Sequence, residues 1–402
     1  MTMRLSKELE TEAYRCFRCG FCRSQCPVFK AKQNESWNTR GRIILVKALM
    51  EGNLTLSPQI VERLYGCSLC KACETTCPAV VQISEIFKKA RKEIYRSGLW
   101  PKVLMDISSS IEDQKNIYAM PRDDGTIWTM GMEGNINLKV GEKAKVAYFV
   151  GCASSFMGRL EGIPQSMIRI LNHAGVDFTI LGPEEWCCGE PLFLAGAPRL
   201  AEEIVKHNVK TFRELGIETL VASCAGCYRV WRQEYPAVIK EDLGFEVLHS
   251  SELLAQLMDT NKLKLKKGVK GTVTYHDPCE IGRHCGIYEA PRKVLENIPG
   301  IRLVELHKTK GECQCCGGGG LLKAVNPSLA LDIASQKLDE VRAISAKIVT
   351  SGCAACKLNL TDAIKEREAN LEMLDITEMV AKALKPSRPR LAPVILLPKF
   401  SP

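Results

Sequence analysis

Cysteine thiols are the side chains whose number and spacing in this sequence indicate chemistry. The chain has 402 residues and 20 cysteines, and 18 of these fall into four groups. Thiolates bind soft metals, so the grouping indicates reduced thiols that hold metal. A secreted disulfide-rich protein is the alternative, but such proteins are usually small. Here 46% of residues are hydrophobic, 25% are charged, and the N-terminus has no apolar signal core, which is typical of an ordinary globular protein.

Two compact cysteine runs near the N-terminus share the spacing C-x₂-C-x₂-C-x₃-C-P, which is typical of ferredoxins with two four-iron clusters. Three closely spaced thiolates can hold three corners of a cubane, and the cysteine before the proline ligates the other cluster. One cubane [4Fe–4S] cluster is therefore expected on Cys16, Cys19, Cys22 and Cys77. The second is expected on Cys67, Cys70, Cys73 and Cys26. Zinc is the alternative, but a closed zinc tetrahedron does not need the repeated Cys-Pro ending.

Two wider cysteine sets follow, and the second repeats the first about 128 residues later. The first set is Cys152, Cys187, Cys188, Cys224 and Cys227, and the second is Cys279, Cys315, Cys316, Cys353 and Cys356. This regular offset indicates a duplication. Five thiolates are too many for a tetrahedral zinc and one more than a cubane requires, although adjacent cysteines could serve two irons of an opened cluster. Buried structural cysteines would need two matching sets by chance.

The elements around these sets alternate between strand and helix. The first copy is expected to have strands at 145–150, 178–181 and 219–223 and helices at 165–174 and 199–215. The second is expected to have strands at 273–275, 303–306 and 348–350 and helices at 292–297 and 328–344. This order predicts α/β domains with largely parallel sheets. Because each cysteine group follows a strand or begins a helix, the five cysteines of a copy should meet at the carboxyl edge of one sheet.

The N-terminal part is expected to be all-helical, with helices at 37–52, 57–65 and 83–95 around the two runs. Arg40 and Arg42 are interpreted as surface or structural charges, with redox-tuning groups as the alternative. The predicted fold is thus α/β with an N-terminal helical ferredoxin module and two duplicated α/β domains. Its predicted parts are a two-cluster module at 1–100, a linker at 101–142 with Trp128 exposed or facing a partner, domains at 143–262 and 270–385, and a Pro-rich basic tail at 386–402.

The motifs of the two copies resemble the duplicated cysteine-rich CCG domain. The first copy contains GCAS, WCCGEP and SCAGCYR, and the second contains YHDPCEIGR, CQCCGGGG and SGCAACK. Together with the N-terminal runs, residues 10–385 resemble the D subunit of heterodisulfide reductase. The resemblance implies a non-cubane [4Fe–4S] cluster on each set of five cysteines and reduction of a disulfide such as coenzyme M–coenzyme B. All ten cysteines are present, whereas several dehydrogenase-type relatives lack members of the first set.

The implied reaction takes two electrons, supplied one at a time through the cubane sites. Thiol release also needs a proton donor. His276, which precedes Cys279 by three residues, is the candidate donor. A hydrogen-bond partner to a ligand is the alternative interpretation of this histidine. The remaining cysteines, Cys285 and Cys313, are expected to be passive buried thiols, although Cys313 could be an alternative ligand or a redox thiol.

A second hypothesis is an electron-transfer subunit without its own substrate. It would link a flavoprotein dehydrogenase (lactate, glycolate or electron-transfer flavoprotein type) to a quinone, a cytochrome b or a bifurcating flavoprotein. Either hypothesis predicts a complex with flavoprotein, membrane cytochrome b or other redox subunits. The chain is expected in the cytoplasm or attached through a partner at the cytoplasmic face of the membrane, because no run reaches about 18 apolar residues.

The formal net charge of +9 indicates an acidic partner, an anionic substrate or simply a solvated lysine-rich surface. Nucleic-acid binding is not expected, because no basic helix interleaved with aromatics or known binding module is evident. The tail at 386–402 is interpreted as a segment that docks on another protein of the complex, with a disordered tail as the alternative.

Overall fold

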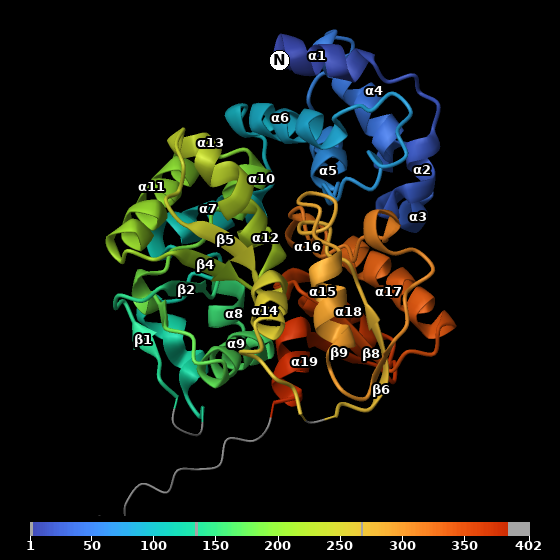
Figure 1. The fold of residues 1–402 in the computed structure, drawn as a ribbon. Helices are drawn as coiled ribbons and strands as arrows, with labels where there is room; N and C mark the ends of the chain where they lie inside the picture. Colours follow the sequence, from blue (N-terminus) through green and yellow to red (C-terminus); the bar gives the residue numbers. More distant parts are fainter. Residues whose placement is uncertain (1–2, 133–135, 267, 385–402) are drawn as a thin grey trace, which may run out of the picture.

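The computed structural model describes residues 3–132, 136–266 and 268–384, so the expected tail at 386–402 lies outside the described residues. The predicted fold class is confirmed: a helical N-terminal module adjoins two α/β domains (Figure 1). Among the described helices, none combines the length and apolar character that a bilayer crossing requires.

The N-terminal module consists of short helices around the two cysteine runs. The helices are α1 (Lys7–Tyr14), α2 (Phe21–Gln25), α3 (Pro27–Lys32), α4 (Thr39–Met50), α5 (Pro58–Tyr65) and α6 (Ile83–Arg96). Ser57 caps α5 as its sequence suggests, because its hydroxyl accepts a hydrogen bond from the Ile60 amide at 3.4 Å. The amphipathic helix α6 buries Ile86, Phe87 and Ile94 in the core of the module. This core holds the two cysteine runs against each other.

The segment expected to be a linker contains regular structure. Helix α7 (Lys102–Gln114) buries Leu104 and Ile111, and a 3-10 helix (Arg122–Thr129) follows it. The expectation that Trp128 faces solvent or a partner was wrong. Trp128 is 3% exposed, its indole Nε1 donates to the Gly125 carbonyl at 2.9 Å, and it packs in the core of the α/β part. Burial of this large side chain fixes the segment to the first α/β domain.

The first α/β domain has one parallel sheet in the order β1-β3-β2-β4-β5. Its strands are β1 (Lys139–Val140), β2 (Val146–Phe149), β3 (Phe178–Ile180), β4 (Thr219–Ala222) and β5 (Glu246–His249). Its helices are α8 (Cys152–Phe156), α9 (Gly162–His173), α10 (Glu190–Ala195), α11 (Pro198–Glu214), α12 (Ala225–Arg229), α13 (Tyr235–Ile239) and α14 (Ser250–Asp259). The predicted strands appear as β2, β3 and β4, whereas β1 and β5 were not predicted.

The second α/β domain repeats this arrangement in the order β7-β6-β8-β9, again parallel throughout. Its strands are β6 (Gly271–Tyr275), β7 (Ile301–Leu303), β8 (Ile348–Ser351) and β9 (Glu372–Asp375). Its helices are α15 (Glu289–Glu296), α16 (Leu322–Val325), α17 (Pro327–Ala343), α18 (Ala354–Glu366) and α19 (Ile376–Lys382). Without β1, the two sheets have the same strand order, as a duplicated sequence requires.

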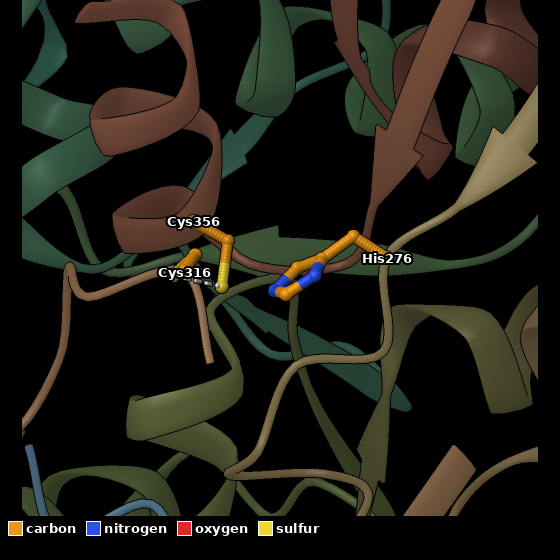
Figure 2. A group of neighbouring side chains, drawn as sticks. All are labelled: His276, Cys316 and Cys356. Atoms are coloured by element: carbon orange, nitrogen blue, oxygen red, sulfur yellow. Dashed lines mark hydrogen bonds between the residues drawn. The ribbon is translucent and has the colours of Figure 1, made fainter. Parts of the chain in front are cut away.

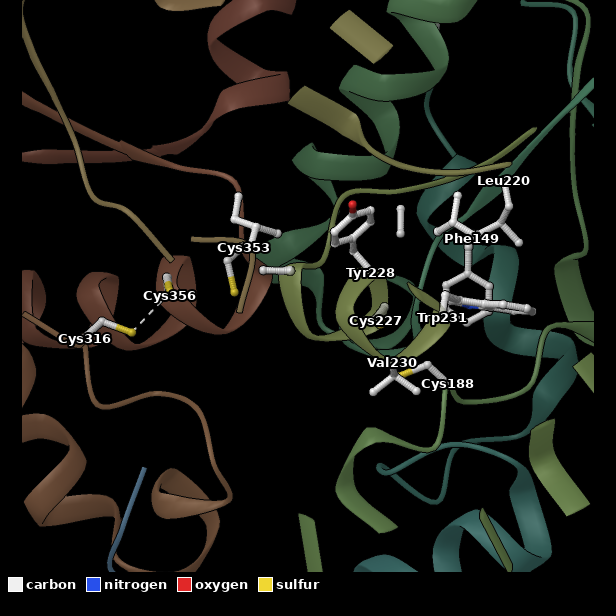
Figure 3. Close-up of a cluster of buried hydrophobic side chains, with 14 of the residues drawn as sticks. Phe149, Cys188, Leu220, Cys227, Tyr228, Val230, Trp231, Cys316, Cys353 and Cys356 are labelled. Carbon is white, nitrogen blue, oxygen red and sulfur yellow. Dashed lines mark hydrogen bonds between the residues drawn. The ribbon is translucent and has the colours of Figure 1, made fainter. Parts of the chain in front are cut away.

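The two α/β domains share their hydrophobic cores. Both large core clusters contain residues of both domains; one, for example, joins Phe149 of β2 to Val349 of β8. Figure 3 shows that side chains of the first domain, including Cys188 and Cys227, and of the second, including Cys353 and Cys356, belong to one of these clusters. The N-terminal module packs on both domains, with α6 against α10, α3 against α17 and α5 against α16 (Figure 1).

Helix α19 begins at a buried carboxylate that makes stability depend on pH. Asp375 is fully buried and accepts hydrogen bonds from the Thr377 amide and hydroxyl at 2.9 and 2.8 Å. Burial raises the pKa of Asp375 from its ordinary 3.8 to about 7. The folded chain therefore holds this proton at pH values where the unfolded chain has released it. The contribution to the free energy of unfolding thus falls as the pH rises from about 4 to about 7.

We expect Asp375→Asn to remove most of this pH dependence, since asparagine also caps a helix but carries no charge. The stability advantage of the variant over the parent should grow by about 2–3 kcal/mol between pH 5 and pH 8. Thermal denaturation midpoints at both pH values measure this. The exposed Asp242→Asn provides the control, and parallel pH curves for the parent and Asp375→Asn would contradict the prediction.

Candidate iron–sulfur sites

The structure brings together Cys16, Cys19, Cys22 and Cys77, which line one hollow in the N-terminal module. Cys16 and Cys19 lie on the loop between α1 and α2, Cys22 lies in the first turn of α2, and Cys77 comes from the second run. The loop bends around the hollow because Arg18 and Gly20 have positive φ angles of 58° and 90°. Cys19 is exposed, so we name this group the outer set. Four converging sulfurs around a hollow fit a four-iron cluster.

The inner set, Cys26, Cys67, Cys70 and Cys73, lines a second hollow. The loop that carries three of them repeats the backbone of the first loop, with φ angles of 50° at Leu69 and 58° at Lys71. The Leu69 amide donates to the Cys67 sulfur at 3.4 Å. Thr39 borders both hollows, so the outer and inner sets are neighbours. The donor set again matches a four-iron cluster.

The first CCG set, Cys152, Cys187, Cys188, Cys224 and Cys227, lies at the carboxyl edge of the first sheet. Cys152 begins α8 after β2, and Cys224 precedes α12 after β4. The Cys152 and Cys187 sulfurs are 3.9 Å apart, and the Gly189 amide donates to the Cys187 sulfur at 3.4 Å. All five cysteines line one cavity of about 390 Å³. Five thiols on one cavity fit a cluster larger than a single metal ion.

The second CCG set, Cys279, Cys315, Cys316, Cys353 and Cys356, occupies the equivalent edge of the second sheet and is buried. The Cys316 and Cys356 sulfurs are 3.2 Å apart. The amides of Gly317 and Gly318 donate to the sulfurs of Cys315 and Cys316 at 3.3 and 3.5 Å. These amide contacts, like those of the first set, are of the kind that tune an iron–sulfur cluster.

His276 lies beside the second CCG set. Its ring points toward Cys316 and Cys356 (Figure 2), and ligating atoms of the three residues lie within 4.8 Å of one another. Its Nδ1 is 3.6 Å from the Cys313 sulfur. His276 is not among the residues that line the cavity of the first set. These contacts favour a role of His276 as a hydrogen-bond partner of the cysteine ligands. They do not favour a role as a proton donor to a molecule in that cavity.

The two cysteines outside the sets have different surroundings. Cys313 is buried, and the buried Lys337 ammonium lies 3.5 Å from its sulfur. Burial alone would raise the pKa of Cys313, but Lys337 and His276 together hold that pKa below its usual range. Cys285 is half-buried, and its sulfur lies 3.5 Å from the Gln233 side-chain nitrogen. The cationic surroundings of Cys313 were not evident from the sequence.

The four sets lie in series through the molecule. The inner set meets the second CCG set at Cys70, whose pKa is raised by a hydrogen bond to Cys315 and by burial. The second CCG set meets the first at Cys353. Hydrogen bonds from Cys227 and Cys353 lower the pKa of Cys224. The sets are therefore neighbours in the order outer, inner, second CCG and first CCG.

Sequence reasoning missed the buried charges around these sets. Arg229 pairs with Glu280 across the two domains and with Glu234 at 2.9 Å. Glu190 lines the cavity beside the first CCG set. Glu185 accepts hydrogen bonds from the Val150 and Gly151 amides, and burial raises its pKa to about 8. Glu190, which directly follows Cys187-Cys188-Gly189, is a member of this network that a sequence motif marks.

Comparison with known proteins agrees with this arrangement. The cysteine-rich CCG domain family matches residues 146–231 and 273–361, and the 4Fe-4S dicluster domain family matches residues 12–81. The D subunit of the dihydromethanophenazine:CoB–CoM heterodisulfide reductase of Methanosarcina acetivorans is 32% identical, over 92% of this chain and 93% of its own length.

Two further relatives have other names. The B subunit of the fumarate reductase (CoM/CoB) of Methanothermobacter marburgensis is 28% identical, over 92% of this chain and 72% of its own length. The EtfAB:quinone oxidoreductase of Syntrophomonas wolfei is 26% identical, over 92% of this chain but 58% of its own length. The four cysteine sets, the duplicated domains and the full-length similarity together show that the chain is an iron–sulfur oxidoreductase in the family of the heterodisulfide reductase D subunit, with domains that bind 4Fe–4S clusters.

Proposed function

We propose that the chain is the disulfide-reducing subunit of a heterodisulfide reductase-type complex. The observation that carries this proposal is the cavity of about 390 Å³, which all five cysteines of the first CCG set line. A cluster on the five thiols would occupy the part of the cavity next to them, and the lining beyond the cysteines, which includes Met157 and Leu358, supports the binding of a substrate beside it. The closest chemical fit is a disulfide with an alkyl arm, such as coenzyme M–coenzyme B, because most of the remaining lining is apolar.

The ligand assignment follows the four sets. The outer and inner sets would each hold a cubane [4Fe–4S] cluster, and each CCG set would hold a non-cubane [4Fe–4S] cluster. These groups would supply single electrons, two of which reduce one disulfide to two thiols with the uptake of two protons. The chain itself positions the disulfide in the cavity, whose wall opposite the first CCG set includes Gly318, Gly319 and Gly320 of the second domain. The second domain therefore borders the place where the disulfide would lie, although none of the cysteines of the second CCG set lines the cavity.

Electrons would enter at the outer set, which is nearest to solvent. Phe17, Phe21 and Val80 are exposed beside it, and Phe17 is 75% exposed. Exposed apolar side chains next to a redox site favour contact with another protein. A flavoprotein or a membrane cytochrome b would supply electrons there, and the chain would lie in the cytoplasm or at the cytoplasmic face of the membrane through such a partner.

The proposal is tested by anaerobic oxidation of reduced viologen with the coenzyme M–coenzyme B heterodisulfide as acceptor. The purified chain should first be shown to carry about sixteen irons, as four four-iron clusters require. We expect turnover that depends on the disulfide. Ala324→Phe, which places a large ring on the cavity wall, should raise the KM at least about tenfold without loss of iron, equivalent to about 1.4 kcal/mol of binding. The exposed Ala343→Phe is the control and should leave the KM unchanged.

Full iron content without turnover would overturn reduction of the coenzyme M–coenzyme B heterodisulfide and leave either another disulfide as the substrate or no substrate at all. The latter corresponds to the second candidate, an electron-transfer subunit that links a flavoprotein dehydrogenase to a quinone, a cytochrome b or a bifurcating flavoprotein. Similarity to the EtfAB:quinone oxidoreductase supports that candidate. In that case the clusters should be reduced and reoxidised by such partners, and Ala324→Phe should have no effect on either rate.

A further inference from the structure

Two of the four buried arginines of the described chain have no acidic partner there. Arg229 and Arg292 pair with carboxylates, the former with Glu280 and the latter with Asp277. Arg42 and Arg91, which are fully buried, form no ion pair with any described residue. An unpaired charge away from water is costly, so an anionic group is expected close to these two side chains.

Both unpaired arginines lie beside the inner cysteine set. Arg91 donates to the Cys67 carbonyl at 2.6 Å, and Arg42 lines the hollow of the inner set. Arg42 also donates to the carbonyls of Arg63 and Gly66, at 2.6 and 2.9 Å, but its buried Nη1 has no hydrogen-bond partner among the described residues. Carbonyl oxygens are only dipoles and leave the charge of each guanidinium unbalanced.

A third, partly buried arginine contacts the same set. Arg283 donates from Nε to the Cys70 carbonyl at 2.5 Å and from Nη1 to the Cys313 carbonyl at 2.5 Å. It too has no carboxylate partner among the described residues, and its buried Nη2 has no hydrogen-bond partner there. Around the outer set, by contrast, Arg40 and Arg23 pair with Glu35 at 2.6 and 3.5 Å. The uncompensated positive charge is therefore placed at the inner set.

We propose that Arg42, Arg91 and Arg283 are positioning residues that balance the charge of the cluster held by the inner set and thereby raise its reduction potential. Reduction adds one electron to a centre that four thiolates already make negative. Burial away from water disfavours the added negative charge, and three fixed guanidinium charges stabilise it. The centre between the outer set and the CCG sets can then accept an electron instead of blocking its passage. This inference uses the ligand assignment proposed above but not the disulfide reaction.

The guanidinium of Arg91 is held in place by backbone carbonyls. Its five acceptor carbonyls come from the α5 end, from Leu194 of the first α/β domain and from Gly320 of the second. The position of this charge is therefore fixed by all three parts of the chain.

The test is a redox titration of the full-length, iron-loaded chain, followed by electron paramagnetic resonance. Cys19→Ser identifies the signal of the outer set, and the other ferredoxin-type signal is then assigned to the inner set. In Arg42→Met and Arg91→Met, the ratio of reduced to oxidised inner cluster at a fixed potential should fall at least tenfold. A tenfold change corresponds to 59 mV for one electron. Arg91→Lys should retain most of the parental potential because it keeps the charge.

Arg40→Met is the matched control, because Arg40 lies beside the outer set and is already paired with Glu35. It should leave the inner cluster unchanged. Parental potentials in iron-loaded Arg42→Met and Arg91→Met would overturn the proposal. If the methionine variants fail to bind iron, loading of both Arg42→Lys and Arg91→Lys would support a requirement for charge. If the lysine variants failed to bind iron as the methionine variants did, the arginines would have a purely structural role, and the proposal would be overturned.

Discussion

Cys224→Ala is expected to abolish disulfide turnover while leaving most of the iron in place. Cys224 lines the cavity, precedes α12 and contacts Cys353, so it lies where the two CCG sets meet. Its loss should remove about four of about sixteen irons. Because the loss of a supporting group alone typically costs 10–100-fold, turnover should fall by at least about 100-fold when a ligand is lost. Iron analysis and viologen oxidation measure the two effects.

Cys285→Ser is the control for this experiment. Cys285 is half-buried and belongs to none of the four sets, so the variant should keep its iron and its rate. The electron paramagnetic resonance signals of the outer and inner sets should persist in Cys224→Ala, because both sets lie in the N-terminal module. Parental iron content together with parental turnover in Cys224→Ala would contradict the assignment of Cys224 as a ligand.

Gly320→Ala is expected to separate the N-terminal module from the second α/β domain. A Cβ at Gly320 would overlap the backbone of Ser68, which follows Cys67, and the φ angle of 65° is unfavourable for alanine. Since a backbone cannot move aside cheaply, the variant should lose about 2–4 kcal/mol of the free energy of unfolding. We also expect loss of iron from the inner set. Anaerobic denaturation and iron analysis test both effects.

The neighbouring glycine offers a matched control. A Cβ at Gly319 would meet no atom within 4 Å, and this residue does not have a positive φ angle. Gly319→Ala should therefore keep its iron, and its free energy of unfolding should lie within about 0.5 kcal/mol of that of the parent. If the two variants were equally stable, the close approach of Gly320 to Ser68 would have no energetic consequence, and the contact between the module and the domain would be loose.

The sequence predicted the fold and the grouping of the cysteines because both depend on local spacing. Strands β2, β4, β6 and β8 stand out as short apolar runs directly ahead of cysteines. Strands β5 and β9 were missed because no cysteine group follows either of them to mark its end. Trp128 was misplaced because its neighbours Asp123 and Asp124 are typical of a loop, whereas its burial depends on packing against distant core residues.

The buried arginines could not be predicted for the same reason. Arg91 stands in an amphipathic helix among lysines, where a charged residue ordinarily faces solvent. Its carbonyl partners Leu194 and Gly320 are 103 and 229 residues away in the sequence. Local patterns contain no signal for such contacts. The cavity is likewise formed by the first domain, by α7 and by the second domain together, and no single segment indicates it.

The close contact of Ser68 with Gly320 also constrains how the protein matures. Cys70 packs against Cys279 and Cys315, and Arg91 joins the inner loop to both α/β domains. These contacts cover the inner set, in which Cys26 and Cys70 are buried. The scaffold protein that delivers iron and sulfide must therefore reach the inner loop before the second α/β domain docks on it, or during a transient opening of that contact. Iron starvation during synthesis should then trap chains with separated domains, which proteases would cleave between the module and the α/β part.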